Sequence, residues 1–316
     1  MRVFVTGATG FVGGRVLRAL LDAGHDVRAL VRPGSVESAR HTLEGVDIAE
    51  GDVLADDLDE HLKGIDAVIH LVGIIREDVR RNVTFERLHV EATANVIQAM
   101  SRRDVRRVVH MSALGGDIEG PTAYFRSKGA AEDLLRCSGL DWTVIRPSII
   151  YGPGDSFVSM LARQVRIAPV VPVIGDGEYQ LQPVWASDVA QGFVQALSRD
   201  DSIGRRFDVG GSETITYDEL LDKIGAALGR ARVPKIHLPL GMMRPIVRSL
   251  GRLSVSPITE GQLTMLLMNN TTDERPYFDF FDIEPTDLEE GLCQFLGPPE
   301  AECSAVTTDP VEAVQT

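Results

Sequence analysis

Three side chains in the middle of the sequence have the types and spacing needed for proton transfer. Tyr124 and Lys128 are four residues apart, so on a helix both project from the same face. A neighbouring ammonium group stabilises a phenolate, and we expect Lys128 to lower the pKa of Tyr124 from its ordinary value of about 10 toward neutrality. Ser112 follows an apolar segment and would hydrogen-bond a substrate oxygen. The three residues predict general acid–base chemistry with no metal ligand involved.

A second pattern, at the start of the chain, is typical of phosphate binding. Gly7, Gly10 and Gly13 follow a β-branched run and precede a helical pattern. We expect Gly7 to take a positive φ, Gly10 to let backbone N–H groups approach a pyrophosphate, and Gly13 to bring helix and strand close together. The phosphate would then lie at the helix N-terminus. The G-x-x-G-x-x-G spacing differs from the G-x-G-x-x-G of the dinucleotide-binding fingerprint.

The elements that must position these residues alternate along residues 1–150. Predicted strands cover 2–6, 26–31, 46–50, 66–71, 107–111 and 142–146, and predicted helices cover 11–23, 54–62, 85–100 and 123–137. This alternation predicts an α/β fold with a doubly wound parallel sheet of the Rossmann type. Ligands bind outside the carboxyl ends of the strands in such a sheet, and the candidate residues follow strands.

From Tyr151 the alternation loosens, and residues 151–296 are predicted to form a smaller substrate lobe interleaved with the sheet. Predicted elements are helices at 157–166, 187–197, 216–228, 240–253 and 286–295, and a strand at 205–209. Thr216 with Glu219, and Thr286 with Glu289, have the spacing of capping boxes. Residues 297–316 lack periodicity and are predicted to be a disordered tail.

Composition limits the function classes. The 316 residues carry a formal net charge of −14, which argues against nucleic acid as a partner because phosphate neutralisation needs a basic face. Three scattered cysteines are too few for a disulfide framework or a zinc site. The chain opens directly into a predicted core strand and has no apolar run long enough for a transmembrane segment, so we expect a cytoplasmic protein.

Taken together, the motifs resemble those of the short-chain dehydrogenase/reductase superfamily in its extended or atypical, NAD-dependent epimerase/dehydratase-like form. They are TGATGFVG at 6–13, GDV at 51–53, HLVG at 70–73, MSALGG at 111–116, YFRSK at 124–128, RPSIIYGPGD at 146–155 and PVWASDVA at 183–190. The resemblance extends to about Leu292. Segment 258–292 is most similar to relatives of an accessory subunit of respiratory complex I, while NmrA-like regulators and sugar-nucleotide epimerases share the N-terminal half.

The resemblance implies roles for individual positions. Lys128 would hold the nicotinamide ribose as well as tune Tyr124. The other implied cofactor contacts are the pyrophosphate loop (Gly7, Thr9, Gly10, Phe11, Val12, Gly13), the adenine-contacting pair (Asp52, Val53), the residues after the fourth strand (Val72, Gly73), and the border of the nicotinamide (Pro147, Ser148). His89 occupies the position of an asparagine that helps to organise a proton-relay water in the family, which puts efficient reductase chemistry in doubt.

The choice of cofactor depends on the end of the second strand. An acidic residue there would bind the ribose 2′-hydroxyl of NAD, but this chain has Arg32 and no acid before Glu37. Arg32 can meet a 2′-phosphate, so NADP(H) is favoured and NAD(H) is the alternative. The simplest other interpretation is that Arg32 ends the strand in solvent.

Two functions remain open at this point. The first is an NAD(P)(H)-dependent oxidoreductase acting on a small-molecule carbonyl or alcohol, with epimerase or dehydratase chemistry less favoured. The second is a non-catalytic NAD(P)(H)-binding protein, either a redox-sensing regulator or a complex I-associated factor. Apolar side chains in the predicted lobe suit a substrate pocket or a core equally: Phe157, Met160, Val184 and Trp185.

A basic stripe in the lobe bears on the second function. Arg244, Arg248 and Arg252 recur at four-residue spacing on the predicted helix at 240–253. The stripe fits a surface helix that closes the substrate lobe. The alternative is a patch for an anionic membrane surface or an acidic partner.

Overall fold

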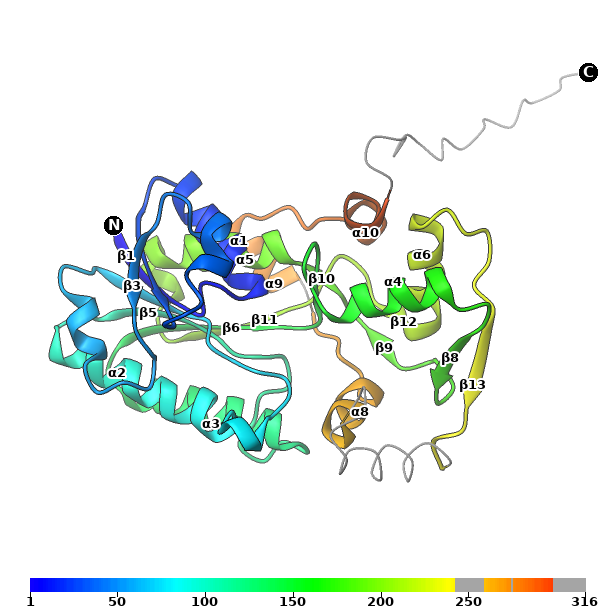
Figure 1. Cartoon of the computed structure of the whole chain (residues 1–316), viewed down its shortest axis with the longest axis horizontal. Coiled ribbons are helices and arrows are strands. Elements are labelled where there is room, and N and C mark those ends of the chain that lie inside the picture. The colour runs from blue at the N-terminus through cyan, green and yellow to red at the C-terminus, as the bar shows by residue number, and fades with distance from the viewer. Residues whose placement is uncertain (242–258, 274, 298–316) are drawn as a thin grey trace, which may run out of the picture.

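The computed structural model describes residues 1–241, 259–273 and 275–297, and a seven-stranded sheet forms its centre (Figure 1). The strands lie in the order β11-β6-β5-β4-β1-β2-β3, and every neighbouring pair is parallel. Their bounds are β1 (Arg2–Thr6), β2 (Asp26–Val31), β3 (Asp47–Glu50), β4 (Ala67–His70), β5 (Arg107–Met111), β6 (Asp141–Pro147) and β11 (Arg205–Val209). The predicted doubly wound Rossmann-type sheet is confirmed.

Helices cover both faces of this sheet, which is why its strands are apolar without alternation. Figure 1 shows α2 (Ala92–Arg102) and α3 (Ala123–Cys137) along one face, and α1 (Phe11–Asp22), α5 (Ala186–Ser198) and α9 (Arg275–Phe281) along the other. On β1, Val3 and Val5 join the core under α1 and α5, while Phe4 joins the core under α2. The first strand is therefore buried on both sides.

The remaining described elements form a smaller lobe beyond the sheet, on the right of Figure 1. Its three two-stranded sheets pair β7 with β10, β8 with β13, and β9 with β12. The bounds are β7 (Ile150–Tyr151), α4 (Phe157–Ile167), β8 (Val171–Ile174), β9 (Gln180–Leu181), β10 (Val184–Trp185), β12 (Ile215–Thr216), α6 (Tyr217–Ala227), β13 (Lys235–Leu238), α8 (Glu260–Leu267) and α10 (Leu288–Leu296). Tyr151, Leu161 and Leu220 lie in the core that these elements enclose.

Three predicted helices differ in detail. The segment predicted at 54–62 is helical only in the short 3₁₀ turn η2 (Leu58–Leu62), and the segment at 85–100 begins with the wide turn η4 (Glu86–Glu91) before α2. Helix α10 is capped by Asp287, which accepts from the N–H groups of Glu289 and Glu290. The predicted cap at Thr286 is wrong because its hydroxyl and N–H donate to the buried Asp188.

The other predicted capping box is confirmed. Thr216 accepts from the Glu219 N–H at the start of α6, and the Glu219 carboxylate accepts from the Thr216 N–H. The structure adds three further 3₁₀ turns among the described residues, η1 (Glu37–Leu43), η3 (Val79–Arg81) and η5 (Asp200–Ser202). Most of the predicted helix at 240–253, with Arg244, Arg248 and Arg252, and the predicted tail beyond Gly297 lie outside the described residues. Within the described ranges, no helix is long and apolar enough to cross a membrane.

Candidate functional site

The sheet reverses its winding between β1 and β4, and the candidate residues gather at the carboxyl ends of these strands. From β1 the order runs to β2 and β3 on one side and to β4, β5 and β6 on the other. A crevice for a ligand is expected outside the carboxyl ends at such a reversal. Gly10, Arg32, Asp52 and Gly73 are all exposed there, each after its strand.

The glycine loop has the local geometry predicted for two of its glycines. Gly7 has φ +73°, and a Cβ on it would lie 2.9 Å from the carbonyl carbon of Leu71. A Cβ on Gly13 would lie 2.3 Å from the Gly7 carbonyl oxygen, so only glycine lets α1 pack this close to the loop. Gly10 is the N-cap residue of α1 and makes no side-chain cap, which leaves the first N–H groups of the helix without an intrahelical partner.

The other loop residues present mainly backbone to the crevice. Thr9 is exposed and Phe11 half-buried, whereas Val12 belongs to the core and cannot turn outward. The guanidinium of Arg15 lies 5.0 Å from the Phe11 ring centroid and donates to the Pro153 carbonyl. Arg15 therefore ties the loop after β7 to the first turns of α1.

At the expected adenine end, the side chains are held by local contacts. Asp52 is exposed and its Oδ1 accepts from the Leu54 N–H at 2.9 Å, while Val53 is buried. The side-chain amide of Asn95, on α2, donates to the carbonyls of Val53 and Ala55 at 2.7 and 2.8 Å. Asn95 holds this loop in place, a role that its sequence context does not predict.

Gly73, which follows β4, lies next to the side chain of Lys128 on α3. A Cβ on Gly73 would lie 3.0 Å from Lys128 Nζ, so the glycine leaves room for the lysine. The ammonium donates to the Met111 carbonyl at 3.0 Å. Burial lowers the pKa of Lys128 to about 8, against the smaller opposing effect of the Glu132 carboxylate.

Tyr124 lies among aromatic rings, and the predicted lowering of its pKa is wrong. Its ring lies 5.7 Å from Phe85, 5.6 Å from His89 and 5.6 Å from Phe125, centroid to centroid. Burial raises the pKa of Tyr124 to about 12, because desolvation disfavours the charged phenolate. The side chain therefore holds its proton at neutral pH.

His89 has both ring nitrogens engaged by the protein. Nε2 accepts from the Ile74 N–H at 3.0 Å, so Nδ1 carries the proton and donates to Ser127 Oγ at 2.7 Å. Burial, together with the Lys128 charge, lowers the pKa of His89 to about 2 and keeps it neutral. This imidazole braces the loop after β4 against α3, and neither nitrogen is available to order a relay water in this arrangement.

A buried network that the sequence did not reveal connects the glycine loop with the same region. The Thr93 hydroxyl donates to the His89 carbonyl at 2.6 Å, so its oxygen accepts from His70 Nε2 at 3.2 Å. His70 Nδ1 then accepts from the Thr6 hydroxyl at 2.6 Å, directly before Gly7. Burial lowers the pKa of His70 to about 3, which fixes the neutral form. No local pattern signals contacts between residues so far apart in sequence.

Ser112 and the residues after β6 are more enclosed than expected. Ser112 is buried, and its Oγ has no hydrogen-bond partner in the described part of the chain. A Cβ on Gly116 would lie 3.1 Å from that oxygen and 3.2 Å from Glu132 Oε1. Glu132 forms a two-pronged ion pair with Arg146, which also donates to the Gly116 carbonyl. The role predicted for Ser112 stays a prediction.

Pro147 and Ser148 also form hydrogen bonds with the backbone of neighbouring segments. The Pro147 carbonyl accepts from the Leu114 N–H at 2.9 Å, and the Ser148 hydroxyl donates to the Gln182 carbonyl. Among the suggested pocket residues, Val184 is fully buried in the core beneath α5, and Trp185 packs on Tyr151 with centroids 5.2 Å apart. Phe157 is half-buried and Met160 is exposed on α4.

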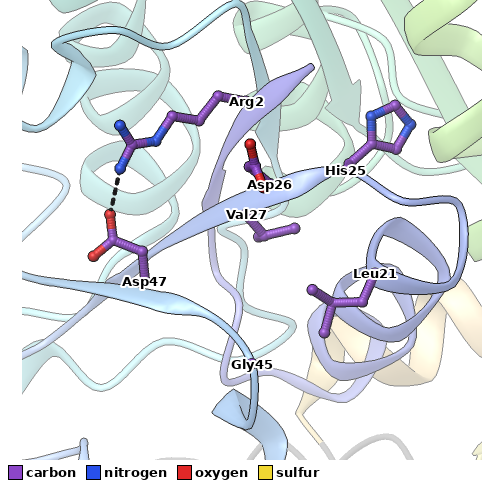
Figure 2. A pocket seen from close by; sticks show the side chains of 7 residues that line it. All are labelled: Arg2, Leu21, His25, Asp26, Val27, Gly45 and Asp47. Atoms are coloured by element: carbon purple, nitrogen blue, oxygen red, sulfur yellow. Dashed lines mark hydrogen bonds and ion pairs between the residues drawn. The ribbon is translucent and has the colours of Figure 1, made fainter.

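Two cavities lie away from these residues. Figure 2 shows one of about 370 Å³ at the amino ends of β1 and β2, where Arg2 and Asp47 form an ion pair at 2.7 Å. Another, of about 490 Å³, lies between α6 and β13 in the smaller lobe and is lined by Arg230 and Lys235 among others. Neither is lined by a candidate site residue. No cluster of His, Cys, Asp or Glu suited to a metal occurs among the described residues.

A doubly wound parallel sheet with a glycine loop at its winding reversal is typical of an NAD(P)H-binding protein, and the sequence comparisons agree. A family model described as NAD(P)H-binding matches residues 7–163. The chain is 30% identical over 291 residues to NADH dehydrogenase [ubiquinone] 1 alpha subcomplex subunit 9 of Mus musculus, covering 90% of this chain and 73% of that protein. It is 31% identical over 275 residues to sterol demethylase protein B of Methylococcus capsulatus, covering 78% and 80%.

The chain therefore belongs to the NAD(P)H-binding family that includes these complex I subunits. Its coverage of individual relatives varies. The match to the Arabidopsis thaliana subunit 9 is 32% identical over 69% of this chain and 56% of that protein, and the match to the Dictyostelium discoideum subunit covers 66% of that protein. The curated complex I relatives are described as mitochondrial, so the expected cytoplasmic location stays a prediction.

Solved structures show the same fold. The UDP-glucose 4-epimerase of Thermotoga maritima superposes with a TM-score of 0.72 at 19% identity, over 94% of this chain and 97% of that chain. A UDP-glucuronic acid 4-epimerase of Bacillus cereus in complex with NAD gives 0.74 at 19% identity, over 94% and 96%. At this identity the likeness concerns architecture only.

Proposed function

We propose that the protein is an NADP(H)-dependent oxidoreductase that reduces a carbonyl group to an alcohol. The observation that carries the proposal is the convergence of Tyr124 and Lys128, on one face of α3, with Gly73 at the carboxyl end of β4, beside the glycine loop. Bound NADPH would supply the hydride. The residues of this chain would bind the cofactor, orient the substrate oxygen and provide the proton.

Tyr124 is the proton donor in this proposal. A pKa of about 12 keeps the phenol protonated at neutral pH, which suits donation to the oxygen of a carbonyl that gains a hydride at carbon. Lys128, whose pKa is lowered to about 8, would hold ribose hydroxyls through its ammonium. Ser112 would orient the substrate oxygen once the loop that follows it moves aside from its buried hydroxyl.

The cofactor site would be built mostly from backbone. The uncapped start of α1 offers N–H groups to a pyrophosphate, Gly10 would leave space for its approach, and Gly7 and Gly13 let the loop turn and pack closely against α1. Arg32, exposed after β2, would pair with the 2′-phosphate of NADP(H). Asp52, Val53, Val72, Pro147 and Ser148 complete the proposed contacts.

Cofactor binding and turnover are tested separately. Calorimetry with NADPH and NADH measures the first, and Gly10→Glu should abolish it by filling the pyrophosphate position. Unchanged affinity in Gly10→Glu would refute the site. Turnover is tested by following NADPH absorbance with a panel of ketones and aldehydes. Because one relative is named a sterol demethylase protein, a sterol ketone belongs in that panel.

A non-catalytic role is the second candidate, and His89 favours it. Both nitrogens of this imidazole are committed to the protein, where the family has an asparagine that supports the proton relay. A protein that holds NADPH as a structural group in respiratory complex I would need the glycine loop but no relay. Tight NADPH binding without turnover on any carbonyl, together with co-purification with complex I subunits, would support this alternative.

A further inference from the structure

The loop between β4 and η4 is an ordered, protruding turn with an apolar tip. Val79, on η3, is 74% exposed, and Ile75 is 55% exposed. Asp78 and Val83 exchange two backbone hydrogen bonds of 2.8 and 2.9 Å, and Asn82 closes the turn in the left-handed conformation with φ +57°. The tip is therefore held in shape by its own backbone, although its large apolar side chains face solvent.

The acidic and the basic residues around this tip make different contacts. Residues 75–82 contain three arginines and two acids, in a chain whose net charge is −14. The Glu77 carboxylate accepts from the Phe85 N–H at 2.8 Å, and Asp78 accepts from the Arg81 N–H at 3.3 Å, so both acids face their own loop. Arg76, Arg80 and Arg81 are exposed, and Arg81 also forms an ion pair with Asp78 at 3.5 Å. The loop around Val79 thus has an apolar tip and a net charge of +1.

The loop is anchored at both ends to the candidate site. At its start the Ile74 N–H is bonded to His89, and at its end the Phe85 ring contacts both His89 and Tyr124. Whatever the tip binds would lie at the mouth of the crevice beside Tyr124.

We infer that this tip, formed by Ile75, Val79, Arg76, Arg80 and Arg81, docks on the surface of an anionic lipid membrane. Apolar side chains that enter the interface, flanked by arginines that meet anionic headgroups, are the combination that interfacial binding requires. A protein partner is less well suited, because two exposed apolar side chains on one short loop offer far less than the roughly 800 Å² per partner of a stable interface. The inference is independent of turnover.

Vesicle co-sedimentation of the full chain tests the inference. Binding should be several-fold stronger to vesicles of phosphatidylcholine mixed with phosphatidylglycerol than to pure phosphatidylcholine, and added salt should weaken it. Val79→Asp and Arg80→Glu should each lower the binding to mixed vesicles about tenfold. Both positions are exposed, so the melting temperature and NADPH affinity should stay at wild-type values.

Ile167→Asp is the matched control, because Ile167 is 70% exposed at the end of α4 in the other lobe. It should bind vesicles as the wild type does. A Val79→Trp variant adds a direct readout, since its emission should shift to the blue with mixed vesicles beyond the response of Trp142 and Trp185 in the wild type.

Three results would overturn the inference. One is an absence of binding to mixed vesicles, and another is equal loss of binding in Ile167→Asp and Val79→Asp. The third is that the protein binds a purified protein complex in a way that depends on Val79 but does not bind vesicles. That result would make the tip a protein interface. A failure of NADPH binding would affect the proposed function alone.

Discussion

The glycine loop and the wall formed by α3 and η4 solve the problem of holding a ligand in different ways. The loop uses backbone: Gly7 and Gly13 remove Cβ atoms where a carbonyl or a strand comes close. The wall and the adjoining strand β4 use buried polar side chains, with His70, His89 and Lys128 fixed by partners from other segments. A backbone site depends on steric room, whereas a side-chain site depends on protonation and on long-range contacts. Substitutions should therefore fail differently in the two regions.

The largest effect is expected in the loop. Gly13→Ala would place a Cβ 2.3 Å from the Gly7 carbonyl oxygen and should lower the free energy of unfolding by at least about 3 kcal/mol. Chemical denaturation measures it. Gly14→Ala is the control, since its Cβ meets only the Thr42 side chain at 3.1 Å, and its effect should stay within about 1 kcal/mol. Equal stabilities would show that the loop tolerates side chains.

On the wall, Tyr124→Phe should affect chemistry and leave the fold intact. Turnover of a responsive carbonyl substrate should fall by about two to four orders of magnitude, because the proton donor is lost, while NADPH affinity changes little. Tyr179→Phe is the control, since the buried Tyr179 hydroxyl has no hydrogen-bond partner among the described residues and lies in the smaller lobe. Full activity in Tyr124→Phe would place the acid elsewhere.

The wall should also respond to pH, which the loop should not. Lys128 has a folded-state pKa of about 8, below its ordinary value of 10.5, so the unfolded chain binds more protons between these values. Wild-type stability should therefore rise as the pH goes from 8 to 10.5, by up to about 3 kcal/mol relative to Lys128→Met. Denaturation of both proteins across this window measures the difference. Parallel profiles would contradict the burial of an ionisable amine.

The smallest effect is expected at Arg32, on the rim of the loop region. Arg32→Asp should weaken NADPH binding by about tenfold or more and leave NADH nearly unaffected, because one charge-assisted contact to the 2′-phosphate is lost. Arg18→Asp, at an exposed position on α1, controls for the change of charge. Calorimetry with both nucleotides gives the ratio. Equal losses of affinity for NADPH and NADH would show that Arg32 only ends the strand in solvent.

The same contrast explains what the sequence could predict. Gly7 and Gly13 were assigned correctly because positive φ and close approach are properties of a local backbone pattern. The same-face placement of Tyr124 and Lys128 followed from helical spacing. The sequence does not predict the role of His70, because its partner Thr6 is 64 residues away. The cap predicted at Thr286 is wrong because Asp188, 98 residues away, binds that residue instead. The predicted pKa of Tyr124 is wrong because the spacing of residues along the sequence does not show how deeply a side chain is buried.

The strand order has a consequence for how this chain is made. Among the seven strands of the sheet, β1 is synthesised first, lies in the interior of the sheet and gains its second neighbour only when β4 is synthesised. The face under α1 is completed later still, by α5 and then by α9 at Arg275–Phe281. Contacts this distant along the chain close slowly, and an unfinished parallel sheet exposes apolar strands. We expect folding to finish only after most of the chain is synthesised, so nascent chains ending before α9 should depend on chaperones.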